Sequence, residues 1–219
     1  ESHVPHEVMH CVLATHFAKP LPRWADEGIA VAAEGAGEQI NHDVRCRELL
    51  NAGRGIRLKT LFRMRDYPRD LMTLYAQGHS VIRFLLASPV KPGPEGAVEK
   101  DGKIIRTFRS VPYAESVING QPVQFSAFFD PGKPQQVLLA FIEIGMYKNT
   151  AESWDRAARE VYGFDSVDAL EESWVEWLKD PKSRLKSKPE PVTPAKPAAK
   201  SADPELIPPT KLPGVDPDR

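Results

Sequence analysis

The residues His6-Glu7-Val8-Met9-His10, near the start of the 219-residue chain, constrain its fold most strongly. On an α-helix, residues four apart lie on one face about one turn apart, so two such imidazoles can reach a single ion. Glu7, next to the first histidine, then points beside that ion toward a bound water. The sequence therefore predicts a helix over residues 4–17 with His6 and His10 as metal ligands and Glu7 as the general base.

A catalytic zinc site has three protein ligands and keeps one position open for water. A proline turn at residues 20–22 ends the first helix, and residues 23–35 predict a second helix that carries Glu27. Because the turn is long enough for the two helices to pack antiparallel, we expect Zn²⁺ bound by His6, His10 and Glu27. The alternative is a surface helix with two histidines and an ordinary exposed carboxylate at Glu27.

The segments HEVMH and RWADEGIAV resemble the gluzincin zinc metallopeptidases, in which H-E-x-x-H lies on one helix and a glutamate ligand on the next. The resemblance, and not the spacing, gives weight to Trp24 and Gly28 beside Glu27. A shorter likeness at Tyr75-Ala76-Gln77-Gly78 implies that the Tyr75 hydroxyl acts as a catalytic donor to the developing oxyanion. A packing role for Tyr75 on an amphipathic helix is the alternative.

One position departs from the gluzincin pattern. In several branches an acidic residue four positions after the glutamate ligand supports a ligand histidine, and here that position is Val31. Asp26 or Glu34 is the alternative support, although neither occupies the matching place. We therefore expect weakened support of the ligands, at a cost of about 10–100-fold in metal affinity or activity.

The resemblance implies a zinc metallopeptidase that hydrolyses peptide bonds through a water activated by Glu7. We expect an N-terminally truncated fragment, because the sequence starts at Glu1 and offers no upstream strand to align a peptide substrate. Two alternatives stay open. One is a non-catalytic secreted or surface interaction module that keeps the gluzincin fold, and the other is a zinc hydrolase with a non-peptide substrate.

Charge and composition exclude several partners. Lys and Arg (29) nearly balance Asp and Glu (30), so net charge gives no reason to expect nucleic acid. No apolar stretch in the sequence reaches the roughly 18–20 residues needed to cross a bilayer. Cys11 and Cys46 can form one bridge in an exported protein, and by themselves they leave the compartment undecided. The metallopeptidase interpretation gives the expectation of an exported protein (periplasmic, cell-surface or secreted) whose partner is a peptide or protein substrate. The oligomeric state stays open.

The fold class that we predict is mainly α, within α+β. It comprises the helical part of a gluzincin-like domain over residues 1–182, a β-rich insertion at 89–134, and a disordered tail at 183–219 that holds nine of the 21 prolines.

Asp101-Gly102 and Asn119-Gly120 predict two hairpins in the insertion. The other predicted helices cover residues 39–52, about 68–88, 134–146, 150–162 and 167–178. The apolar residues Val8, Cys11, Val12 and Phe17 follow a helical period on the first helix. We expect the four remaining histidines, His3, His16, His42 and His79, to be structural.

Overall fold

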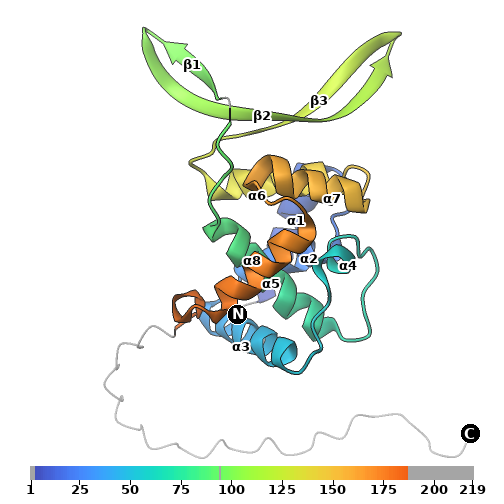
Figure 1. The fold of residues 1–219 in the computed structure, drawn as a ribbon, viewed down its shortest axis with the longest axis vertical. Helices are drawn as coiled ribbons and strands as arrows, with labels where there is room; N and C mark the ends of the chain where they lie inside the picture. The colour runs from blue at the N-terminus through green and yellow to red at the C-terminus, as the bar shows by residue number, and fades with distance from the viewer. Residues whose placement is uncertain (1–2, 94, 187–219) are drawn as a thin grey trace, which may run out of the picture. The chain divides into compact units, whose positions relative to one another are not determined.

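The structure is a computed structural model that describes residues 3–93 and 95–186. It is mainly helical, with one small antiparallel sheet, which confirms the predicted α+β class (Figure 1). The helices are α1 (His3–Phe17), α2 (Arg23–Ala32), α3 (Ala36–Asn51), α4 (Leu58–Leu61), α5 (Leu71–Ala87), α6 (Pro134–Met146), α7 (Ala151–Ala157), the π-helix η1 (Ala158–Tyr162), α8 (Val167–Lys179) and the 3₁₀-helix η2 (Pro181–Ser183). In the described ranges no helix has the length and apolar character required to cross a membrane. Residues 187–219 of the expected tail lie outside the described residues.

The sheet consists of β1 (Gly96–Lys100), β2 (Lys103–Ile118) and β3 (Gln121–Phe129), with β2 in the middle. The two predicted hairpins are confirmed, and they share the single long strand β2. At Asn119 and Gly120 the φ angles are 50° and 77°, the left-handed values that a type I′ turn requires. The helix α6 packs against both β3 and α5, and so lies between the sheet and the other helices (Figure 1).

Two glycines allow a close contact between α2 and α5. A Cβ at Gly28 of α2 would lie 2.6 Å from the carbonyl carbon of Gly78 on α5. A Cβ at Gly78 would lie 2.6 Å from the Trp24 carbonyl oxygen. Neither position has room for a side chain, so the two backbones touch directly. This contact fixes the position of Glu27, which precedes Gly28.

Aromatic side chains fill the core around α2. The indole of Trp24 is fully buried and stacks on Phe62 with ring centroids 4.5 Å apart, and Trp154 meets it edge-on at 5.9 Å. The weight that the gluzincin resemblance gave to Trp24 thus has a packing explanation. The α4 helix, which the periodicity did not predict, presents Leu58 and Leu61 to the same core.

The first helix is less buried than its sequence pattern suggested. Val8 and Val12 are 54% and 53% exposed, and Cys11 is also exposed. The predicted helix is confirmed as α1, but only its Leu13 is buried, so the apolar period does not form a buried stripe at these three residues. Cys11 and Cys46 are both free thiols, and the possible bridge between them is not formed.

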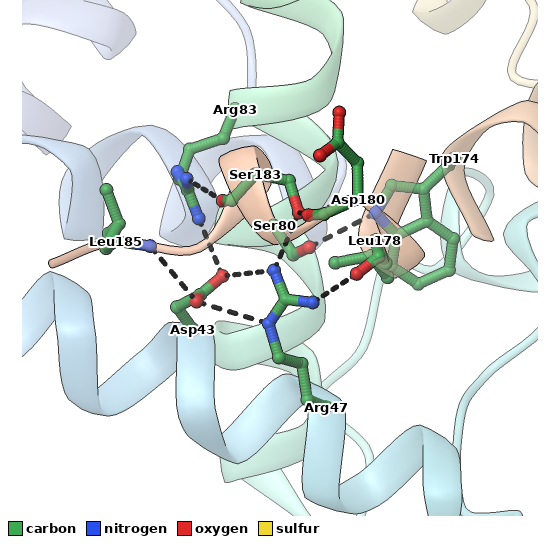
Figure 2. A network of polar contacts seen from close by, with 9 residues as sticks. All are labelled: Asp43, Arg47, Ser80, Arg83, Trp174, Leu178, Asp180, Ser183 and Leu185. Atoms are coloured by element: carbon green, nitrogen blue, oxygen red, sulfur yellow. Dashed lines mark hydrogen bonds and ion pairs between the residues drawn. The ribbon is translucent and has the colours of Figure 1, made fainter. Parts of the chain in front are cut away.

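A polar network ties the end of α8 and the segment after it to α3 and α5 (Figure 2). Asp43 of α3 is 2% exposed and accepts hydrogen bonds from the guanidinium of Arg83 at 2.6 Å and from that of Arg47 at 3.3 Å. Arg83 also donates to the Ser183 carbonyl at 2.6 Å, and the Leu185 amide donates to Asp43 at 3.4 Å. The chain up to Leu185 is therefore joined to the helical body by buried charge.

Candidate metal centre

The structure brings the three predicted ligands together. His6 and His10 lie on α1 and Glu27 on α2, and one ligand atom of each lies within 4.8 Å of the others. Glu27 Oε2 is 3.4 Å from His6 Nε2 and 3.6 Å from His10 Nε2. Glu27 is only 3% exposed, so the exposed-carboxylate alternative is wrong. The group can hold a metal ion.

Each histidine is oriented by a carboxylate on its other ring nitrogen. His6 Nδ1 is 2.6 Å from Glu34 Oε1, and His10 Nδ1 is 2.7 Å from Asp26 Oδ1. Because an ionised carboxylate only accepts hydrogen bonds, each Nδ1 donates its proton, and in the neutral imidazole this tautomer directs the lone pair of Nε2 toward Glu27. This arrangement is typical of metal-binding histidines.

The expected weakness of this support was therefore wrong. Val31, the position named by the gluzincin pattern, is fully buried in the core. Asp26 reaches His10 from the position before Glu27, and Glu34 reaches His6 from the turn after α2. The backbone of Glu34 is held in that turn by the Gln39 side chain, which donates to its carbonyl at 2.8 Å.

The charge balance of the group favours a cation. Among the described residues no lysine or arginine forms an ion pair with Glu27, and the two imidazole contacts of 3.4 and 3.6 Å are longer than an ordinary N–H···O hydrogen bond of about 2.7–3.2 Å. A buried carboxylate whose charge no cation balances is costly. Three ligand atoms that face one another at these distances fit a metal ion between them.

The sequence did not point to Tyr67, which makes a direct contact with the group. Its hydroxyl donates to Glu27 Oε1 at 2.6 Å, and the guanidinium of Arg23 lies 4.5 Å above its ring. Burial, and then the Glu27 carboxylate, raise the pKa of Tyr67 to about 12, so the phenol keeps its proton. Tyr67 thereby fixes one oxygen of Glu27 and leaves the other toward the histidines.

Glu7 and Tyr75 lie beside the group without a direct bond to it. Glu7 is exposed on α1 next to His6, and Tyr75 is half-buried on α5. Burial, and then the charge of Glu27, raise the pKa of Tyr75, with Arg23 opposing and Glu7 adding to the rise. The Tyr75 phenol is thus within the field of both carboxylates, and its catalytic role stays a prediction.

Two of the remaining histidines form a buried pair on the far side of Glu34. His42 Nε2 is 4.0 Å from Glu34 Oε2, and the rings of His42 and His79 are 6.2 Å apart. His79 is fully buried, and neither of its nitrogens has a hydrogen-bond partner among the described residues. Burial, and then the charge of Arg83, lower the pKa of His79 to about 3.

Comparisons of the chain with models of protein families, with curated proteins and with solved structures found no match.

Proposed function

We propose that the chain is a zinc-dependent hydrolase of the gluzincin kind, an exported enzyme that cleaves peptide bonds. The observation that carries the proposal is the double orientation of the ligands. Both imidazoles are held by carboxylates so that their Nε2 atoms face Glu27 Oε2 at 3.4 and 3.6 Å. These two separations would suit a zinc ion with bonds of about 2.0–2.2 Å, and the ligand atoms of His6 and His10 lie within 4.8 Å of each other.

A zinc ion, when bound, supplies a Lewis acid that lowers the pKa of a water at its open position. The Glu7 carboxylate, which follows His6 on the solvent side of α1, accepts a proton from the attacking water and returns it to the leaving amine. The Tyr75 hydroxyl donates to the carbonyl oxygen as negative charge develops on it. Asp26 and Glu34 hold the imidazoles in place during these steps.

The decisive experiment replaces Glu7 by Gln. The amide keeps the shape of the side chain but cannot accept a proton, so the variant should bind zinc in the parent's stoichiometry and lose nearly all turnover of a peptide library. Elemental analysis and peptide mass spectrometry provide the two measurements. The Glu38→Gln variant, altered at an exposed position of α3, is the matched control and should keep both properties.

Three other results would change the proposal. Protein that neither contains zinc nor acquires it on addition would remove the metal assignment. Zinc binding without hydrolysis of any peptide or ester would favour the non-catalytic module. Turnover of esters alone would favour a zinc hydrolase with a non-peptide substrate.

A further inference from the structure

A second surface feature lies at the other end of α1, around Tyr147 in the segment after α6. Two hollows meet at this side chain, with cavity volumes of about 330 and about 360 Å³. Four basic side chains line them, and we call the hollows together with these residues the basic groove. They are Lys19, Arg65, Lys148 and Arg156.

The cations of the basic groove are not neutralised by the described residues. All four are exposed, and none of them forms an ion pair with a carboxylate in the described ranges. Arg156 donates to the backbone carbonyl of Pro112, while Lys19 Nζ lies 5.8 Å from the Tyr147 ring centroid. One carboxylate, Glu115, lines the groove. The lining is therefore strongly positive in a chain whose net charge is −1.

Two tyrosine rings form an aromatic wall in the groove. Tyr113 and Tyr147 meet edge to face with centroids 5.2 Å apart, and the Tyr113 hydroxyl donates to Glu143 at 2.8 Å. Burial, and then this hydrogen bond, raise the pKa of Tyr113, so the phenol stays neutral. Cations beside neutral aromatic rings suit a ligand that combines carboxylates with apolar surface, as an acidic peptide does.

The groove is connected to the metal group through one short segment. Arg65 lines the groove, and its carbonyl accepts a hydrogen bond of 3.1 Å from Arg23 Nε. Arg23 in turn covers the ring of Tyr67, the residue that donates to Glu27. A chain bound in the basic groove would thus contact the segment that contacts the metal ligand.

We infer that the basic groove binds acidic stretches of the peptide substrate. The inference builds on the proposed function, and it names the substrate class as peptides rich in Asp and Glu. A nucleic acid is the less suitable occupant, because the cations are confined to one groove and the balanced overall charge provides no long-range field. Peptide carboxylates need only these local cations, above all the guanidiniums of Arg65 and Arg156.

The test measures binding separately from catalysis. The full chain carrying His10→Ala, which lacks one metal ligand, is titrated with fluorescein-labelled peptides of alternating Glu and Ala or of alternating Lys and Ala, and anisotropy is recorded. The acidic peptide should bind, more tightly at about 20 mM than at about 300 mM NaCl, and the basic peptide should not. Joint reversal by Lys19→Glu and Lys148→Glu should weaken binding about tenfold.

The matched control is Lys179→Glu, an exposed reversal on α8 outside the groove, which should change the affinity by less than about twofold. Circular dichroism of each variant checks the fold. Equal binding of the two peptides, or no effect of the joint reversal, would overturn the inference, as would tighter binding of a single-stranded oligonucleotide. Because the binding protein lacks the metal, binding without peptide hydrolysis by the parent would support the groove while refuting the proposed function.

Discussion

Glu27 and Asp43 are both buried carboxylates, but the protein treats their charges in opposite ways. Asp43 accepts hydrogen bonds from two guanidiniums and one backbone amide, so its charge is neutralised inside the fold (Figure 2). Glu27 has a tyrosine hydroxyl as its only close donor in the described ranges, and one of its oxygens faces two imidazole nitrogens. The difference between the two indicates that a buried carboxylate is a candidate binding group where, as at Glu27, no lysine or arginine in the described ranges balances its charge.

The largest loss of stability is expected from a change at Asp43. Asp43→Ala removes a buried carboxylate and leaves the part-buried guanidiniums of Arg47 and Arg83 without their common partner, so it should lower the free energy of unfolding by about 3 kcal/mol. Urea denaturation with and without zinc measures this loss, which should be the same in both conditions. Glu48→Ala removes the exposed ion pair with Arg45 and, as a control, should cost less than about 1 kcal/mol. A loss that zinc restores would contradict the structural role of Asp43.

Glu27→Gln should have a different outcome. The amide oxygen still accepts from Tyr67, and a buried charge disappears, so the zinc-free variant should be at least as stable as the zinc-free parent. Zinc at a hundred times its dissociation constant should stabilise the parent by about 2.7 kcal/mol and the variant by nearly nothing. Thermal denaturation with and without zinc measures both quantities. A variant that is much less stable without zinc would mean that Glu27, like Asp43, serves the fold.

The supporting carboxylates provide a finer test. Asp26→Asn and Glu34→Gln should each weaken zinc binding by about 10–100-fold, because an amide orients the imidazole less strictly and lowers its basicity. Competition with a fluorescent chelator measures the affinity. The exposed change Glu38→Gln should leave it unaltered. Parent-like affinity in both variants would show that the contacts of 2.6 and 2.7 Å do not serve the metal.

Protonation of His79 should make the stability of the fold depend on pH. His79 lies in the field of Arg83 and Asp43, and its ring is next to that of His42, which lies beside Glu34. Burial, and then the charge of Arg83, lower its pKa to about 3 in the folded state. The unfolded state binds a proton near pH 6.5, so stability is full above that pH and falls as the pH drops toward 3. At pH 5 the expected loss is about 1–2 kcal/mol. Urea denaturation at several pH values, with a chelator present, measures the slope of the unfolding free energy against pH. His79→Leu should remove this part of the slope, and the exposed change His16→Leu should not.

The sequence predicted the parts of the site that follow from helix spacing. The positions of His6, His10 and Glu27 depend on two neighbouring helices and one short turn, so the structure brings them together as predicted. The hairpin turns were predictable for a similar reason, because Asp-Gly and Asn-Gly favour left-handed φ values locally.

The contacts that the sequence missed, at Tyr67, or left as alternatives, at Glu34 and Asp26, depend on tertiary structure. Tyr67 lies in an irregular segment whose path is fixed by distant contacts, such as the Arg23 amide donating to the Met64 carbonyl at 3.2 Å. Glu34 reaches His6 only because α2 ends at Ala32, earlier than its apolar pattern suggested. Asp26 comes directly before Glu27, and neighbouring helical positions lie about a quarter-turn apart, so the sequence indicated that its side chain could reach a histidine of the same group.

Because α1 is only slightly buried, it should separate from the rest of the fold more easily than the other long helices. This helix has one buried residue, Leu13, and it exposes Val4, Val8 and Val12. Its ligands are close in sequence to Glu27, so the loop that a metal ion would close is short and its entropy cost small. Amide hydrogens of α1 would then exchange rapidly in metal-free protein and slowly once an ion joins α1 to α2. A bound ion would therefore stabilise the packing of α1 on α2, in addition to any role in catalysis.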